Sequence, residues 1–195
     1  MNNNPILEFE KFIKNSKNNE TSEHVRRVSS YTKQLCILLG IENEKTNIIS
    51  KASVFHDIGK ILIPDAILNK ADKLNHEEWK TVKTHALLGY EMLKRSNNDI
   101  FQVASLIAYS HHEKWDGTGY PLSLRGDEIN LFARIVAVVD VFDALCSIRS
   151  YKKEWAVEKA LDYIADERSK HFDPGITDIF LKNSKLFIKI KNAHR

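Results

Sequence analysis

Glycine and proline are sparse in this chain, and their sparseness is what most constrains its fold. The 195 residues include 7 glycines and 4 prolines, and these fall between segments with the apolar periodicity of helices. In residues 20–39, for example, Val25, Val28 and Leu35 share one helical face, and Gly40 follows where the helix should end. We therefore predict an all-α protein.

Helices are also expected at other segments with this periodicity. They are residues 42–57, 75–93, 101–112, 130–147 and 155–170. Asn75 with Glu78 three residues later predicts a capping box, and Asp173 followed by proline predicts the start of a last helix. Alternation typical of a strand occurs only at 187–190, and residues 113–128 form the one long irregular segment. Irregular segments of this length often carry function.

Composition indicates one globular domain in the reducing cytoplasm. The chain is 43% hydrophobic and 28% charged, and no secretory signal is visible. Its longest apolar run, 135–139, is far shorter than the ~20 residues of a membrane span. Cys36 and Cys146 are isolated, which excludes a disulfide framework. The net charge of +3 is too small to indicate binding to a nucleic acid polymer.

Charged and polar residues interrupt several of the apolar segments. Asp140 lies within the run 135–142, and His56 and Asp57 follow the run 52–55. A buried carboxylate is costly unless it is paired or binds a cation, so one such residue alone would be explained by a core salt bridge. The recurring set comprises His56, Asp57, His85, His111, His112 and Asp140. Its recurrence favours a metal site.

Side chains of this kind could meet at the centre of a helix bundle. Neighbouring residues on a helix point about 100° apart, so neither His56–Asp57 nor His111–His112 can hold one ion alone. Each pair can instead bridge adjacent positions in a cluster supplied by several helices, as in the carboxylate–histidine centres of helix bundles. Nitrogen and oxygen ligands without a thiolate favour iron or manganese over zinc.

Two segments resemble a known family. The sequence HDIGK at 56–60 is similar to the HD signature of the HD phosphohydrolase superfamily, and HHEKWDGTGYP at 111–121 is similar to the signature of its HD-GYP branch. The resemblance extends from about residue 20 to residue 180, and the combination of the two motifs is highly specific. It implies an HD-domain helical bundle with a long glycine-rich active-site loop. It also implies a phosphodiesterase that hydrolyses a cyclic dinucleotide.

The resemblance further implies two or three divalent metal ions. The core ligands that it implies are His56, Asp57, His85, His111, His112 and Asp140, with Asp57 bridging two ions. Glu20 and His24 match a family pair that holds a third ion, and their spacing of four places them on one helical face. An ordinary exposed pair near a helix start is the alternative for both. Clustered ions activate water and clamp phosphate oxygens for in-line attack.

Further residues match family positions in catalysis and substrate binding. Lys60 matches the lysine that contacts the scissile phosphate, where its ammonium can offset developing charge. With the bridging Asp57 it forms the implied catalytic pair. The implied substrate-binding residues are Lys60, Gly119, Tyr120, Asp143, Arg149 and Lys152. The chain departs from the family at Asn130, Ile148 and Ser150, and the last two lie beside one of these residues, so base specificity is less defined than catalysis.

These inferences predict a lead segment at 1–19, an HD-GYP catalytic domain at 20–183 and a basic solvated tail at 184–195. The expected activity is metal-dependent hydrolysis of cyclic di-GMP to linear pGpG, with GMP as a further product. Two alternatives stay open: a hydrolase of cyclic GMP-AMP or another nucleotide phosphoester, and a non-hydrolytic module that binds the dinucleotide. The protein partners considered are a diguanylate cyclase and a second copy of the chain.

Overall fold

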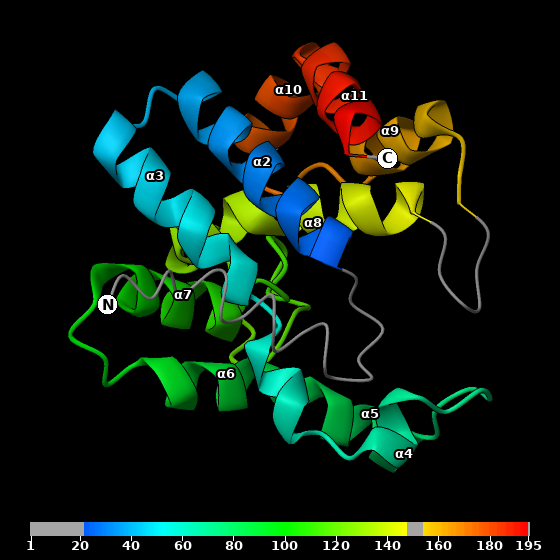
Figure 1. The fold of residues 1–195 in the computed structure, drawn as a ribbon. Helices are drawn as coiled ribbons and strands as arrows, with labels where there is room; N and C mark the ends of the chain where they lie inside the picture. The colour runs from blue at the N-terminus through cyan, green and yellow to red at the C-terminus, as the bar shows by residue number, and fades with distance from the viewer. Residues whose placement is uncertain (1–21, 148–153, 195) are drawn as a thin grey trace.

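The structure is a computed structural model that describes residues 22–147 and 154–194. Within these ranges the chain is helical, and its β contacts are isolated bridges (Figure 1). The elements are α2 (Ser22–Leu38), α3 (Asn43–Ala52), η1 (Ser53–Phe55), η2 (Ile58–Leu62), α4 (Asp65–Leu68), α5 (His76–Lys83), α6 (His85–Leu93), α7 (Asp99–Ser110), η3 (Gly126–Glu128), α8 (Leu131–Cys146), α9 (Val157–Asp166), α10 (Pro174–Lys182) and α11 (Ser184–Ala193). The prediction of an all-α protein is confirmed. No helix in the described ranges has the length and apolar character needed to cross a bilayer.

Helix α8 is the apolar centre of the fold. It packs against α2, α7, α9 and α10 (Figure 1), and its Ile135 and Phe142 are fully buried. The ring of Phe142 meets Tyr31 of α2 and Phe180 of α10, at 5.6 and 5.3 Å between centroids. These edge-to-face contacts stabilise the core beyond the burial of the rings alone. The apolar segment predicted at 130–147 is therefore the helix around which the others assemble.

Side chains cap the helices that the sequence marked with caps. The Asn75 side chain accepts a hydrogen bond from the backbone of Glu78, whose carboxylate accepts one from the backbone of Asn75, so the predicted capping box is present. Asp173 accepts two backbone N–H groups in the first turn of α10. Asn130 accepts a backbone N–H at the start of α8. The chain departs from the family at Asn130, but this asparagine still begins the helix.

Two predicted helices are broken where they approach the centre of the fold. The segment 42–57 is α-helical only as far as Ala52 and continues as the 3-10 turn η1. The segment 75–93 is interrupted at Thr84, between α5 and α6. Apolar periodicity predicted both as continuous because a short 3-10 turn hardly changes the pattern. His56 follows the 3-10 turn η1, and His85 follows Thr84 directly, so each break lies next to a candidate metal ligand.

The prediction for the C-terminal segment was wrong. Residues 187–190, whose alternation is typical of a strand, lie within α11, and the segment expected to be a solvated tail is this helix packed against α2. Phe187 is fully buried, and its ring lies 4.3 Å from that of Phe180. Four alternating residues are too few to distinguish a strand from one face of a helix. Phe187 and the largely buried Lys191 in fact lie four apart on such a face.

A close contact between η2 and α6 requires glycine at position 59. A Cβ atom on Gly59 would lie 2.0 Å from the carbonyl oxygen of His85 and 2.6 Å from the backbone nitrogen of Gly89. Only a residue without a side chain allows two backbones to approach so closely. Because Gly59 follows Asp57 by two residues, this contact also brings Asp57 next to His85.

Candidate metal centre

His56 and Asp57 lie at the junction of η1 and η2. His56 is fully buried, and Asp57 is 7% exposed. The backbone of Asp57, at φ −106° and ψ 15°, departs from helical geometry, so the two neighbouring side chains do not diverge as they would on a regular helix. His56 Nε2 and Asp57 Oδ2 lie 3.3 Å apart. The break in the helix thus lets both residues face one centre.

One group of candidate ligands forms around Asp57 Oδ1. It comprises Asp57, His85, His111 and His112, each with one ligand atom within 4.8 Å of the others. His85 at the start of α6 places Nε2 2.9 Å from Asp57 Oδ1, and His111 at the end of α7 places Nε2 3.6 Å from it. Three imidazoles and one carboxylate at these distances could hold one divalent cation.

A second group contains His56, together with His24 from α2 and Asp140 from α8. Asp140 Oδ1 lies 3.5 Å from His24 Nε2 and 3.7 Å from His56 Nε2. The anomalous aspartate in the apolar run of α8 is therefore directed at two histidines from other segments. These three residues could hold a second cation.

The two groups are adjacent and meet at Asp57. Its Oδ1 faces His85 and His111, and its Oδ2 faces His56 of the second group. The rings of His56 and His111 are 5.3 Å apart between centroids. Asp57 therefore stands where the resemblance places a carboxylate that bridges two ions.

His24 lies differently from its sequence assignment. It was assigned with Glu20 to a third ion outside the six core ligands, whereas the structure groups it with His56 and Asp140. Glu20 lies outside the described residues. The number of ions stays a prediction.

Backbone carbonyls fix the orientation of the histidine rings. Nδ1 of His56 donates to the Ser53 carbonyl at 2.8 Å. Nδ1 of His85 donates to the Val82 carbonyl at 2.7 Å, and Nδ1 of His111 contacts two carbonyls of its preceding turn. These bonds leave Nε2 as the electron-pair donor. The Nε2 atoms of His85 and His111 are buried and make no hydrogen bond within the described part of the chain, which fits a bound cation.

Burial keeps two of these histidines neutral. Desolvation lowers the pKa of His111, with partial compensation from Asp57. Desolvation, reinforced by repulsion from His111, lowers the pKa of His112 well below its usual value. Neutral imidazole is the form that binds a metal. Both side chains are therefore ready to act as ligands near neutral pH.

Lys60 lies at the edge of the first group. Its Nζ donates to Asp57 Oδ2 at 2.5 Å, and a quarter of its side chain is exposed. The ammonium thus borders both the candidate metal centre and solvent. This position is compatible with the phosphate contact that the resemblance implies for Lys60.

Asp143 lies behind His24 and has no exposed surface. Its Oδ2 accepts from His24 Nδ1 at 2.7 Å, and Arg27 donates to both of its oxygens, at 2.6 and 2.9 Å. Burial alone would raise the pKa of Asp143, but the hydrogen bonds from His24 and Arg27 lower it to about 2. A carboxylate so enclosed has no surface open to solvent, so its substrate contact stays a prediction. It orients His24, and Arg27, which was not among the predicted site residues, neutralises it.

A buried carboxylate organises the loop between α7 and α8. Glu113 is 2% exposed, and its two oxygens accept the backbone N–H groups of Leu122 and Leu124, at 2.6 and 3.1 Å. A Cβ atom on Gly119 would lie 2.3 Å from the backbone nitrogen of Lys114, so loop packing alone requires this glycine. Glu113 was not among the residues predicted to shape the site. Its place directly after two candidate ligands was the available signal.

Tyr120, in the same loop, lies against the candidate centre. Its ring stacks on His112 with 4.8 Å between centroids and an interplanar angle of 26°. Burial raises the pKa of Tyr120, so the phenol keeps its proton and can donate a hydrogen bond at neutral pH. The remaining predicted substrate-binding residues, Arg149 and Lys152, lie outside the described residues, as do Ile148 and Ser150.

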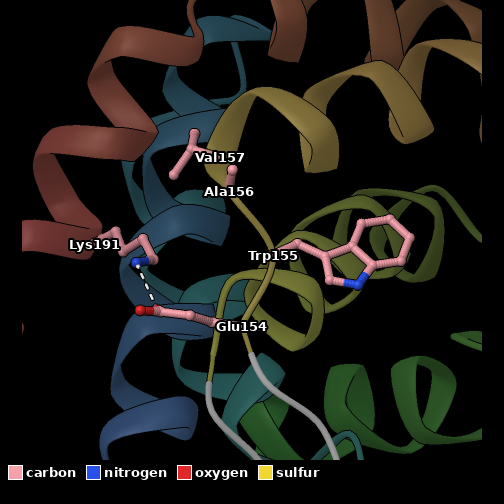
Figure 2. A pocket seen from close by; sticks show the side chains of 5 residues that line it. All are labelled: Glu154, Trp155, Ala156, Val157 and Lys191. Carbon is pink, nitrogen blue, oxygen red and sulfur yellow. Dashed lines mark ion pairs between the residues drawn. The ribbon is translucent and has the colours of Figure 1, made fainter.

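Figure 2 shows a separate hollow beside the start of α9. It has a volume of about 370 Å³ and is lined by Glu154, Trp155, Ala156, Val157 and Lys191. Lys191 Nζ lies 3.6 Å from Glu154 Oε2 across it. None of the candidate metal ligands that the structure describes lines this hollow, so it is distinct from the candidate centre.

The sequence of this chain is similar to a protein-family model and to several known proteins. A family model described as an HD domain matches residues 9–176. The 3'3'-cGAMP-specific phosphodiesterase 2 of Vibrio cholerae is 42% identical over 176 residues, which cover 90% of this chain and 34% of that protein. The cyclic di-GMP phosphodiesterase response regulator RpfG of Xanthomonas campestris pv. campestris is 46% identical over 162 residues, which cover 83% and 43%. The chain thus spans less than half the length of either relative.

A solved structure shares the fold. The HDG"Y"P protein Bd1817 of Bdellovibrio bacteriovorus superposes with a TM-score of 0.66 at 19% identity. The match covers 92% of this chain and 61% of that one. At this identity the likeness concerns the fold.

Proposed function

The chain belongs to the HD domain family, and from this membership we propose that it is a metal-dependent phosphodiesterase that hydrolyses a cyclic dinucleotide. Two relatives are named as cyclic-dinucleotide phosphodiesterases, and a neighbour with the same fold is named an HDG"Y"P protein, which supports the resemblance to the HD-GYP branch. One observation carries the proposal. Two groups of histidine and aspartate side chains lie next to one another and meet at a single carboxylate, Asp57.

The donor set suits two neighbouring divalent cations. Asp57, His85, His111 and His112 would hold one of them, and His24, His56 and Asp140 the other. Nitrogen and oxygen donors without a thiolate make iron or manganese the proposed metals. When bound, such a pair supplies an acidified water and neutralises phosphate charge. The residues themselves set the spacing, because Asp57 directs one oxygen to each group.

Two further side chains would position the phosphodiester. Lys60 Nζ is 2.5 Å from Asp57 Oδ2, so a phosphate that approaches the centre comes within reach of its ammonium. Lys60 would then offset the charge that develops on the phosphate oxygens. The protonated phenol of Tyr120, stacked on His112, would donate a hydrogen bond to the phosphodiester.

We further propose cyclic di-GMP as the preferred substrate, with linear pGpG and then GMP as products. One matched relative is named for cyclic di-GMP and another for 3'3'-cGAMP. Both molecules present the same phosphodiester chemistry, so discrimination depends on contacts to the bases. Arg149 and Lys152 are the proposed contacts to the bases. We also propose that the protein is cytoplasmic and that it has a diguanylate cyclase as a partner. Both would place the enzyme where its substrate is found.

The test is hydrolysis by the purified chain after loading with manganese or ferrous iron. Cyclic di-GMP and 3'3'-cGAMP are supplied in parallel, and products are separated by chromatography. We expect faster conversion of cyclic di-GMP. Faster conversion of 3'3'-cGAMP would favour the alternative substrate, and binding without any conversion would favour the non-hydrolytic module.

Asp57→Asn tests the metal centre in the same assay. We expect turnover to be abolished and bound metal to fall, because the carboxylate shared by both groups loses a charged oxygen. Asp178→Asn on α10, where the carboxylate is exposed, is the control and should retain both. Full metal occupancy with a normal rate in Asp57→Asn would refute the assignment.

A further inference from the structure

Exposed Trp79 and partly buried Lys83 of α5 form an aromatic and cationic surface. Trp79 is 45% exposed although it is a large apolar residue. Lys83 follows it by one helical turn, and its Nζ lies 5.9 Å from the Trp79 ring centroid. The same ammonium lies 5.1 Å from the ring centroid of Tyr120. The lysine is therefore held between two aromatic rings.

This surface adjoins the candidate metal centre through Tyr120. The Tyr120 ring stacks directly on His112, so Lys83 is separated from a candidate ligand by one aromatic ring. Along the chain, Trp79 precedes His85 by six residues, and the backbone stays in the helical region through Thr84. Six residues of helix rise about 9 Å. A group separated by one ribose from a phosphate at the centre would reach this surface.

Within the described part of the chain, no neighbouring carboxylate neutralises the charge of Lys83. Glu77 of α5 pairs with Lys80, and Glu78 pairs with Lys70. Lys83, in contrast, has no carboxylate within ion-pair distance among residues 22–147 and 154–194. Its N–H groups are available to acceptors such as N7 and O6 of a purine. The exposed indole beside it offers a flat surface on which any base can stack.

We propose that Trp79 and Lys83 form an outer base-binding subsite, where one purine of the cyclic dinucleotide stacks on Trp79 while Lys83 donates to its acceptor edge. This inference rests on the proposed phosphodiesterase function and assigns substrate recognition to α5. The subsite acts on binding and leaves the metal centre unchanged. Loss of the stacked ring should therefore raise the KM and leave the kcat almost unaltered.

The experiment compares Trp79→Ala with the wild-type chain, both loaded with manganese. Trp79→Ala should weaken equilibrium binding of cyclic di-GMP about tenfold and raise the KM to a similar extent, which corresponds to one stacked base. Hydrolysis of bis(p-nitrophenyl) phosphate, a phosphodiester without a purine, should not change. Trp79→Phe, which retains an aromatic ring, should recover most of the affinity, and Lys83→Met should also raise the KM.

Leu186→Ala is the matched control, since Leu186 is 40% exposed but lies on α11, far from α5 (Figure 1). It should bind cyclic di-GMP like the wild type. Unchanged affinity in Trp79→Ala, with normal turnover, would overturn the subsite while the proposed function stands. The wild type could also bind cyclic di-GMP without hydrolysing it. Weaker binding by Trp79→Ala in that case would support the subsite and refute the proposed function. A wild type that does not bind the dinucleotide would overturn both.

Discussion

Replacing Asp143 by asparagine isolates the effect of one buried charge beside the candidate metal centre. Asp143 is fully buried, and Arg27 and His24 both contact its carboxylate. Asparagine keeps the shape of the side chain and one acceptor oxygen but leaves the Arg27 cation without its counter-charge. Breaking a buried ion pair in this way costs about 3–5 kcal/mol, and the retained acceptor favours the lower end. At roughly 2–4 °C per kcal/mol for a chain of this size, we expect the Tm to fall by about 6–12 °C.

The pKa of Asp143 adds a pH signature to this prediction. The pKa in the folded chain is about 2, against an ordinary value of 3.8. A carboxyl group with a depressed pKa stabilises the fold above its unfolded pKa, and this contribution is lost as the pH falls through the folded value. The stability difference between wild type and Asp143→Asn should therefore be full at pH 7 and shrink between about pH 4 and pH 2.

The assay is urea unfolding at pH 7 and at pH 3, with the bound metal measured separately. The loss of the negative charge beside His24 should also weaken metal binding about 10–100-fold. Asp178→Asn is a matched control, because Asp178 accepts two hydrogen bonds from Arg168, at 2.7 and 2.9 Å, in almost the same geometry but on the surface. Surface pairs of this kind contribute little, so its stability should not change measurably. Equal effects of the two substitutions would refute the reasoning from burial.

Two other substitutions test the fold and the base contacts. Gly59→Ala should destabilise the chain by about 1–3 kcal/mol in urea unfolding and reduce bound metal, because its Cβ meets the backbone of α6. Gly175→Ala, whose Cβ would have only ordinary contacts, is the control, and equal stability of the two variants would contradict the packing argument. Arg149→Ala should raise the KM for cyclic di-GMP more than it lowers the kcat, if Arg149 binds substrate uniformly. An unchanged KM in steady-state kinetics would remove Arg149 from the site.

Local patterns in the sequence were sufficient to predict the helical class and the candidate ligands. Apolar periodicity and the caps at Asn75 and Asp173 each involve only a few neighbouring residues, so they can be recognised without knowledge of distant contacts. The ligands could be recognised for a similar reason. Asp140 interrupts an apolar run, and a carboxylate in such a place requires a compensating partner.

The wrong expectations also arose from short sequence patterns. Alternation at 187–190 suggested a strand because four residues do not reveal which surface they face. Phe187 is instead in a helix that completes the core against Phe180. In the same way, apolar periodicity predicted helices that continue past Ala52 and Thr84, whereas in the structure α3 ends at Ala52 and α5 ends before Thr84.

The sequence by itself determined which side chains could bind metal ions, and the tertiary structure alone decided how they are grouped. His24 joins Asp140 from a segment more than a hundred residues away, and Asp143, predicted to contact substrate, lies enclosed behind His24. Such neighbours result from packing between distant helices. The free energy of that packing depends on which surfaces meet. One example is the close contact between Gly59 and α6, and no local sequence pattern predicts such a contact.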